Sequence, residues 1–507
     1  MSTRKTPHVV VIGAGIGGLT AGCLLLKAGV RVTVLEAHVY PGGSAGTFYH
    51  QGYRFDAGAT LAGGFGESGP HTRLAQILGI EWPVQPVDPA WVTMIEGLPI
   101  FQWTERQKWH EEIERQFPES RAFWRLQEWL AEQAWQISAR DFPFPPQNVG
   151  DFLQIGAAMR PDTLLAAPFG LLTIGHLLPR SASPALRTFV DAQLLISAQT
   201  TSRFANALYG SAALDLPRRG VNHVRGGVGS LAKILADWLI ANGGVVHYRQ
   251  QVEQITPAPN GEVILRTRKG LEISADAAVA NLTPWGLAQL LGEETPKPLG
   301  KEIHTRPAGW GAFTLYLGLD NSRLPPLQAD HFQVVVHPEQ PLGEGNSVFI
   351  SLSPLDDPSR APTGMRAATL STHTRVADWW NNDPSAYEEK RAAYTEKLLM
   401  AAEMAIPGLR RAIRLCLPGT PRTFAFYTRR PMGMVGGFPQ TSLLKARGSW
   451  TGIERIWLVG DSIFPGQSTA GVTLGAMRVA RQVEAYFADR KRRFPVARFD
   501  WDRFPST

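Results

Sequence analysis

The sequence predicts an α/β protein in which one parallel sheet is assembled from distant parts of the chain. The N-terminal segment contains an apolar strand at 8–12, a glycine turn at 13–18, a helix at 19–27 and a second apolar strand at 30–35. This strand–helix–strand order is the unit from which parallel sheets are built. Near the other end, a buried strand at 456–459 precedes a helix at 472–486. We therefore expect a discontinuous, Rossmann-like dinucleotide-binding domain.

The size and charge of the chain narrow the classes of partner. At roughly 100–200 residues per domain, 507 residues predict two to four domains with a large buried core. The net charge of +7 suits nucleic acid, an anionic membrane surface or an anionic cofactor. The densest basic cluster is only 490–493, and no run of Lys and Arg is long enough to follow a phosphate backbone. We expect no nucleic-acid partner.

Cysteine usage and hydropathy indicate the compartment. The two cysteines, Cys23 and Cys416, are too few for a disulfide framework or a cysteine-rich metal site, and they fit a reducing compartment. Residues 1–7 are short and polar, unlike a signal peptide, and no stretch of about 20 apolar residues is uninterrupted. We expect a cytoplasmic protein without a metal site.

A glycine motif between the first strand and the first helix predicts a dinucleotide site. Gly13, Gly15 and Gly18 form G-x-G-x-x-G, which allows a tight turn, close approach of a pyrophosphate and close helix–strand packing. The helix N-terminus then offers free N–H groups to phosphate. Glu36 follows Gly18 by 18 residues, near the spacing expected for a carboxylate that binds a ribose diol. Two neighbours of these residues are further predicted contacts, namely Gly17 and Ala37.

A second glycine turn follows Glu36, which is unusual for a simple dehydrogenase. Residues 41–46 read PGGSAG, and residues 52–59 read GYRFDAGA. Together they resemble the flavin signature of the amine oxidase and phytoene desaturase superfamily, in which this loop runs along the pyrophosphate and the flavin. The resemblance implies FAD, bound without a covalent link, and contacts from Gly42, Gly43 and Ser44.

The C-terminal region carries the other half of that signature, with WLVGDS at 457–462 and PGQSTAGV at 465–472. In the related flavoproteins the aspartate matching Asp461, after Gly460, bonds the ribityl chain. The helix beginning near Gly471 and Val472 aims its N-terminus at the N1/C2=O edge, where reduced flavin carries negative charge that a helix dipole stabilises. In this superfamily the residue matching Val252 bonds the adenine through its backbone.

The resemblance covers nearly the whole chain and implies an FAD-binding domain in three pieces, an α+β substrate domain and a helical cap. The expected segments are a first FAD-binding piece at 1–95, a helical, substrate- and membrane-facing region at 96–214, a second FAD-binding piece at 215–298, a mixed substrate sheet at 299–440, and a third FAD-binding piece with the C-terminal helix at 441–507.

Within the superfamily, the chain is most similar to the carotenoid desaturase and carotene isomerase branch. Residues 349–364 look like its substrate-domain motif, and residues 186–197 and 421–440 resemble carotenoid C-3',4' desaturases. The resemblance implies an enzyme of carotenoid biosynthesis that removes two hydrogens from a long apolar polyene. FAD takes the electrons, and a quinone or oxygen accepts them next. Because a delocalised cation needs no acid–base dyad, the catalytic residues stay unassigned.

A polyene needs a long apolar tunnel, and aromatic and apolar residues between the FAD-binding pieces are candidate walls. His331, Arg429 and Arg430 are candidate polar contacts. The apolar stretch 164–178, flanked by Arg160 and Arg180, could dip into one leaflet of a membrane or form a buried helical hairpin. The candidate walls are Trp103, Phe169, Leu171, Phe204, Tyr209, Trp310, Phe313, Tyr316, Phe332 and Phe438.

Four other functions stay open at this point. A carotene cis–trans isomerase would use reduced FAD without net oxidation, and a saturase would act on retinoid-like polyenes. A flavin amine oxidase would place an aromatic pair before the flavin, and we identify no such pair in the sequence. A non-enzymatic escort protein would keep the glycine motifs but would not reduce its flavin with any polyene.

Overall fold

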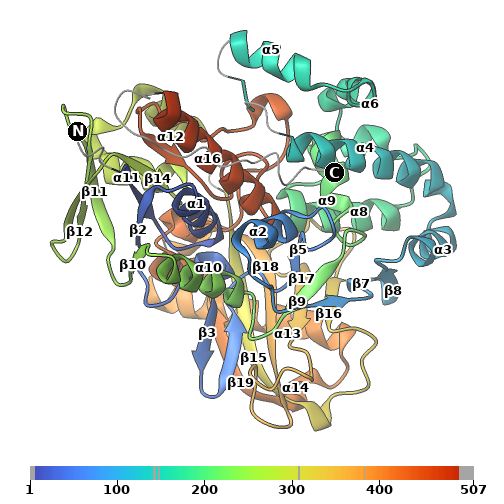
Figure 1. The fold of residues 1–507 in the computed structure, drawn as a ribbon. Coiled ribbons are helices and arrows are strands. Elements are labelled where there is room, and N and C mark those ends of the chain that lie inside the picture. The colour runs from blue at the N-terminus through green and yellow to red at the C-terminus, as the bar shows by residue number, and fades with distance from the viewer. Residues whose placement is uncertain (1–5, 141–143, 147–148, 307–308, 382, 490–507) are drawn as a thin grey trace.

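A five-stranded parallel sheet forms the centre of the protein in the computed structural model, which describes residues 6–140, 144–146, 149–306, 309–381 and 383–489. Its strands come from three distant segments of the chain (Figure 1). This arrangement confirms the predicted α/β fold. The basic cluster at 490–493 lies outside the described residues. The strand order is β10 (Val245–His247), β2 (Arg31–Leu35), β1 (His8–Ile12), β14 (Ala277–Ala280) and β20 (Ile456–Leu458).

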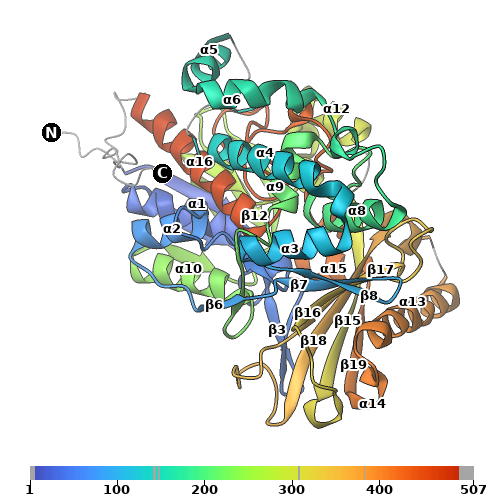
Figure 2. The ribbon, with the colours of Figure 1, turned by 90° about the vertical axis from the view of Figure 1, so that its right-hand side faces the viewer.

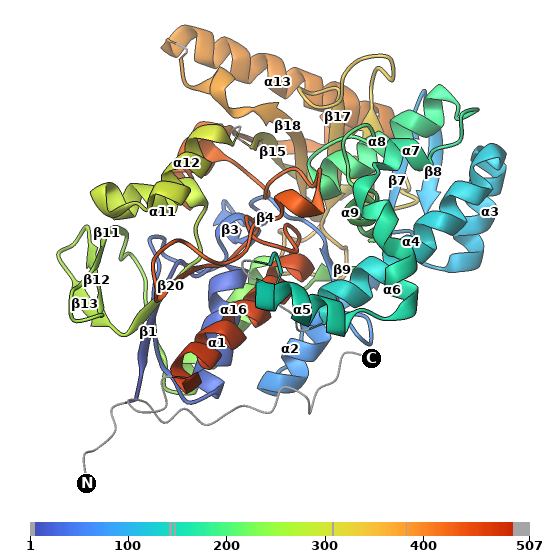
Figure 3. The same cartoon turned by 90° about the horizontal axis from the view of Figure 1, so that it is seen from above.

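Helices and the short strands between residues 252 and 275 pack against this sheet and bury its central strands. Every residue of β1 and β14 is buried, as expected for apolar strands in the middle of a covered sheet, whereas Arg31 in β2 and Val245 in β10 are exposed. In the view from above, α1 and α16 lie side by side over the sheet (Figure 3). The helices of this layer are α1 (Ile16–Lys27), α2 (Pro70–Leu78), α10 (Gly229–Ala241), α11 (Pro284–Leu291), α12 (Lys297–Thr305) and α16 (Thr469–Asp489).

A seven-stranded mixed sheet forms the second layer. Helix α13 (Pro384–Ala405), followed by α14 (Leu409–Ala412), covers one of its faces. Strand β7 pairs with β16 in parallel and with β8, so the predicted domain boundary at residue 95 falls between two paired strands. The strand order is β19 (Ile413–Gly419), β15 (Trp310–Asp320), β18 (Met365–Arg375), β17 (Ser347–Leu352), β16 (His331–Val335), β7 (Trp91–Ile95) and β8 (Leu98–Gln102).

A group of helices packs against the other side of this sheet (Figure 2). The stretch 164–178 forms short helices, and Leu164, Leu165 and Leu171 are exposed, so the buried-hairpin alternative is wrong. Pro168 and the extended residue Thr173, which forms a bridge with Asn206, divide the stretch into segments too short to bury a continuous face. These helices are α3 (Arg106–Gln116), α4 (Arg121–Ala139), α5 (Val149–Ala158), α6 (Pro161–Ala166), η3 (Ala167–Leu171), α7 (Ile174–Leu177), α8 (Pro184–Ala198), α9 (Ala207–Leu214) and α15 (Pro421–Thr428).

Three small sheets complete the fold. None of the described helices is long and apolar enough to cross a bilayer, and the described residues contain no cluster of metal-ligating side chains. The small sheets consist of β3 (Thr47–His50) with β4 (Tyr53–Asp56), of β5 (Ala62–Gly63), β9 (Val221–Val224) and β6 (Val84–Val87), and of β11 (Val252–Pro257), β12 (Val263–Thr267) and β13 (Glu272–Ala275).

Candidate functional site

A cavity of about 1220 Å³ is lined by the carboxyl end of the parallel sheet and by the seven-stranded sheet. Pockets for small molecules usually measure about 300–1,000 Å³, so this cavity has room for a cofactor together with a substrate. One end is lined by the loops after β1, β2, β14 and β20, and the other by residues of β15 to β18. Carboxyl ends of parallel strands are where ligands bind in such sheets.

The first glycine turn lies at the nucleotide end. Gly13, Gly15 and Gly17 line the cavity, whereas Gly18 lies behind it. A Cβ atom on Gly18 would stand 2.3 Å from the carbonyl oxygen of Gly13, which explains its role in close packing. Within the described chain no side chain caps the N-terminus of α1, and its first turn holds no acid. Its N–H groups are therefore available to a phosphate.

Asn281 explains why this turn excludes side chains, and the sequence analysis missed it. A Cβ atom on Gly15 would lie 2.5 Å from Nδ2 of Asn281, and one on Gly460 would lie 2.9 Å from its Oδ1. Asn281 follows β14 directly and lines the cavity. A polar residue immediately after a buried parallel strand was the signal that could have identified it.

The second glycine loop is held against the first. The N–H of Gly42 donates to the carbonyl of Ala14 at 2.8 Å, and Gly42 forms a parallel bridge with Gly15. Gly42, Gly43 and Ser44 all line the cavity, and the Ser44 hydroxyl is buried without a hydrogen-bond partner among the described residues. Because buried polar groups are nearly always paired, an unpaired hydroxyl here fits a polar ligand such as FAD.

Glu36 lies where a ribose would bind. Its carboxylate accepts hydrogen bonds from the N–H groups of Ala14 at 2.6 Å and His38 at 2.7 Å. Each oxygen keeps lone pairs for a diol. Burial raises the pKa of Glu36, and the backbone hydrogen bonds act against that shift. Ala37 and Val252 line the same end of the cavity, as their predicted roles require.

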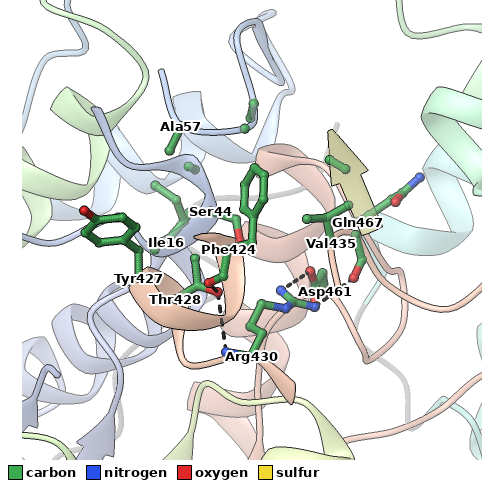
Figure 4. A pocket seen from close by; sticks show the side chains of 18 of the residues that line it. Ile16, Ser44, Ala57, Phe424, Tyr427, Thr428, Arg430, Val435, Asp461 and Gln467 are labelled. Atoms are coloured by element: carbon green, nitrogen blue, oxygen red, sulfur yellow. Dashed lines mark hydrogen bonds and ion pairs between the residues drawn. The ribbon is translucent and has the colours of Figure 1, made fainter. Parts of the chain in front are cut away.

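Asp461 is paired with Arg430 across the cavity wall (Figure 4). The guanidinium donates to the two carboxylate oxygens at 2.7 and 3.2 Å and to the carbonyl of Gly436 at 2.8 Å. The sequence analysis left Arg430 among the candidates, and the structure places it in the cavity. Gly460 and Val472 also line the cavity, whereas Gly471 lies outside it with its N–H donating to Ser468 Oγ at 3.0 Å.

The predicted aromatic walls are mostly elsewhere. Of the ten candidate side chains, Tyr316 lines the main cavity and Tyr209 lines a smaller one of about 90 Å³ beside it. The other eight lie outside these two cavities; Phe313 and Phe332 belong to the core beneath α13, and Leu171 and Phe204 are exposed. His331 is also outside the cavity wall, whereas Arg429 lines it. The observed aromatic lining consists of Tyr40, Phe48, Tyr49, Trp91, Tyr316, Phe349, Phe424 and Tyr427.

Comparison with known proteins identifies the family. Residues 16–483 match the family model described as flavin containing amine oxidoreductase. The chain belongs to this flavin oxidoreductase family. The match confirms the resemblance, the FAD cofactor and the oxidoreductase class. Which residues hold FAD stays a prediction, which the unpaired Ser44 hydroxyl, the bare glycine turn and the Glu36 carboxylate fit.

Several relatives of this flavin oxidoreductase act on carotenoids, by their names. It is 28% identical over 508 residues to the chloroplastic prolycopene isomerase of Daucus carota, covering 94% of this chain and 80% of that protein. It is 28% identical over 519 residues to phytoene dehydrogenase of Streptomyces griseus, covering 95% and 96%. An oxidoreductase structure from Methanosarcina mazei shares the fold, with a TM-score of 0.62 at 19% identity over 94% of this chain and all of that one. The protein is thus an FAD-dependent oxidoreductase of the carotenoid-modifying type.

Proposed function

We propose that this flavin oxidoreductase desaturates a long apolar polyene of the carotenoid class. The observation that carries the proposal is the distribution of charge in the cavity. Its charged lining residues are Glu36, Arg429, Arg430 and Asp461, and all of them belong to the loops at the nucleotide and flavin end.

The substrate end is lined by neutral and apolar side chains. Trp91, Val348 and Phe349 supply apolar surface there. His373 also faces this end, but burial lowers its pKa to about 4, so its ring is neutral at physiological pH. Such a wall favours a hydrocarbon over an amine, because no carboxylate among the described residues lines this end of the cavity to pair with an ammonium group.

FAD and the polypeptide would have separate roles in the proposed reaction. When bound, FAD would supply the acceptor for a hydride from an allylic position of the polyene. The chain would hold the nucleotide through Glu36 and the glycine loops, orient the polyene along the β15–β18 wall and exclude water. A quinone or oxygen would then take the electrons.

A carotene isomerase is the second candidate, because the prolycopene isomerase of Daucus carota is a relative along nearly the whole chain. It would need the same cavity and the same apolar wall, but no net transfer of electrons.

One anaerobic experiment separates the two reactions. Holoenzyme is mixed with liposomes that contain a single carotenoid, and the pigment and the FAD spectrum are followed together. A desaturase produces a pigment with two fewer hydrogens and longer-wavelength absorption while FAD loses its colour. An isomerase changes the cis/trans ratio at constant mass and requires prior reduction of FAD. A pigment that changes in neither way, with a panel of carotenoids, contradicts both.

We also propose that the cytoplasmic protein docks on a membrane through an apolar patch. Leu164, Leu165, Leu171, Phe204 and Leu444 are exposed on α6, on η3, on the loop before α9 and on η8 (Leu443–Lys445). These elements are neighbours, because Asn206 Nδ2 donates to the Gly170 carbonyl at 2.7 Å and because Phe169 and Leu443 pack against the same buried cluster. Exposed basic residues, Arg160, Arg203 and Lys445, flank the patch and would meet anionic headgroups.

A further inference from the structure

A chain of polar side chains leaves the cavity wall at Thr60. Thr60 lines the cavity, and its hydroxyl lies 2.7 Å from the hydroxyl of Ser351. The Ser351 hydroxyl lies 2.9 Å from Nδ1 of His331. Ser351 in β17 and His331 in β16 are paired in the antiparallel register, so the sheet itself holds the last two groups together. Thr60 therefore connects the cavity with a histidine buried behind its wall.

The same chain continues to the surface on the other side of His331. The ring of His223 lies next, with 4.7 Å between the two ring centroids. Nε2 of His223 lies 3.1 Å from Oδ2 of Asp330, whose side chain is 31% exposed. Arg366 donates to the other carboxylate oxygen at 2.5 Å and fixes its orientation. The polar groups thus span the distance from the cavity to solvent.

The burial of His331 distinguishes it from an ordinary histidine in a β-sheet. His331 is 1% exposed, and its Nε2 has no hydrogen-bond partner among the described residues. A buried polar atom without a partner destabilises the fold, so it calls for a physical reason. An apolar side chain would pack beside Phe349, which stacks on His331 and lines the cavity, without that cost.

We propose that Thr60, Ser351, His331, His223 and Asp330 form a proton path between the flavin cavity and solvent. When two hydrogens leave a polyene, one travels to FAD with an electron pair, and the other is released as a proton. That proton enters at Thr60 and passes to Ser351, and each hydroxyl gives up one proton as it receives another. His331 receives the proton at Nδ1 and releases its Nε2 proton to His223, from which Asp330 passes it to water.

The interval between the two imidazoles is the one step for which the structure shows no hydrogen bond. The ring centroids are 4.7 Å apart, so the proposed transfer requires a rotation of one imidazole that brings Nε2 of His331 within hydrogen-bond distance of the His223 ring. The proposed path requires that FAD binds in this cavity, but it does not depend on which substrate the enzyme uses. The same path could also carry a proton from solvent into the cavity.

The charges around His331 determine how it moves a proton. Burial holds the pKa of His331 well below its usual value, and His223, Arg366 and Arg360 act in the same direction while Asp330 opposes them. His331 is therefore neutral and passes protons by exchanging tautomers. Burial acts to raise the pKa of Asp330, but the hydrogen bond from His223 and the charge of Arg366 hold it at about 2. Asp330 is thus a carboxylate at rest, and in the proposed path it holds the proton from His223 only transiently before water receives it.

Proton uptake by the substrate-free holoenzyme tests the path. A light flash in the presence of an added sacrificial electron donor reduces the bound FAD, and a pH-indicator dye reports how fast protons leave the bulk solvent. We expect Ser351→Ala and Thr60→Val to slow uptake by roughly tenfold or more, at the low end of what proton transfer by a positioned side chain contributes. FAD content and its spectrum should not change. His331→Asn keeps a hydrogen bond to Ser351 but cannot exchange tautomers, so it should be equally slow.

Two controls separate the path from a structural effect. Thr369 pairs with Ser351 across β17 and β18, is buried, and lies outside both the cavity lining and the path. Thr369→Val therefore removes a buried hydroxyl at the same depth and should leave the uptake rate unchanged. Azide, a small carrier of protons, should restore uptake in Ser351→Ala. Equal rates in Thr60→Val, Ser351→Ala and Thr369→Val would overturn the path while leaving the polyene proposal untouched.

Discussion

Glu36 binds two backbone N–H groups with one carboxylate, and this double role makes its substitution informative. The bonds to Ala14 and His38 tie the first glycine turn to the loop that follows β2. A glutamine offers only one carbonyl oxygen, so one of the two donors would face an amide NH₂ group. Glu36→Gln should weaken FAD binding by roughly tenfold or more, since losing a hydrogen bond to a charged group costs about 1.5–3 kcal/mol.

Reconstitution of the apoprotein with FAD measures this loss as a change in Kd. Glu253→Gln is the matched control, because Glu253 lies on β11 with an exposed side chain, 3.8 Å from Arg268. An unchanged Kd in Glu36→Gln would remove Glu36 from the FAD site.

His71 makes the stability of the fold depend on pH. It is 1% exposed, stacks on Phe65 with 4.6 Å between ring centroids, and burial lowers its pKa to about 3. The folded state thus binds fewer protons than the unfolded state, whose histidine has a pKa near 6.5. The free energy of unfolding therefore keeps its full value above about pH 6.5 and decreases as the pH falls toward 3. Within this window the loss is about 1.4 kcal/mol per pH unit.

His71→Phe should flatten that dependence, because phenylalanine fills the site without titrating. Urea unfolding at about pH 7 and about pH 5 would show a smaller fall in stability in the variant than in the parent. His337→Gln, at an exposed position, should behave like the parent. Equal falls in His71→Phe and the parent would mean that His71 does not titrate on unfolding.

Three elements meet at the Asn281 side chain, which gives the cofactor end its rigidity. Asn281 lies between the glycine turn before α1 and Gly460 after β20, and its own N–H donates to Ile12 at 2.9 Å. Asn281→Ala should open a void beneath the turn and raise the Kd for FAD by roughly tenfold, equal to about 1.4 kcal/mol. Fluorescence titration of the apoprotein with FAD measures this change.

Asn242→Ala provides the comparison for that experiment. Asn242 ends α10 at an exposed position, where its amide donates to Trp238 at 2.8 Å. It should bind FAD as the parent does. If Asn281→Ala also binds FAD like the parent, the packing of the turn does not depend on this amide.

The elements that the sequence predicted well are those with local signals. The parallel strands β1 and β14 end where the apolar runs end, and the glycine motif fixed the turn between β1 and α1. Helix α1 begins at Ile16, earlier than predicted, because Gly17 and Gly18 adopt helical conformation despite their low propensity. The order of the seven-stranded sheet depends on pairings between distant residues, and no local pattern reports them.

The substrate wall was harder to predict because a strand presents alternate residues to opposite faces. In β15, Thr314 and Tyr316 line the cavity while Phe313 faces the core beneath α13. Both faces are buried, so hydropathy does not reveal which one meets the cavity. The sequence analysis chose aromatic residues by type, and Phe313 was therefore assigned to the wrong face.

At the scale of the whole molecule, polarity changes along one direction. The charged lining residues lie at the nucleotide end of the cavity, and the described lining at the substrate end is uncharged. The smaller cavity beside it shares Ser197, Leu216, Gln467 and Ser468 with the main one. Leu208 and Leu443 line this smaller cavity and belong to the cluster that also contains Phe169 and Ala166, near the apolar patch. A route for the substrate from the patch to the main cavity would therefore meet no charged residue in the part of the smaller cavity's lining that the structure describes.

The proposal that the apolar patch docks on a membrane predicts the effect of charged substitutions in it. Leu165 and Leu171 are 69% and 78% exposed, so replacing both with aspartate removes apolar surface without disturbing the core. Each leucine that enters a bilayer contributes about 1.5–3 kcal/mol, so Leu165→Asp with Leu171→Asp should lower partitioning to anionic liposomes by well over tenfold. Co-sedimentation measures the partitioning, and FAD content and melting temperature should not change.

The matching control places the same charge on another exposed leucine. Leu355 is 66% exposed between β17 and β18, away from the patch, and Leu355→Asp should leave liposome binding intact. Liposomes without anionic lipid should bind the parent more weakly, because Arg160, Arg203 and Lys445 then lack partners. A double variant that still sediments like the parent would mean that another face meets the membrane, and the polyene would need another way into the cavity.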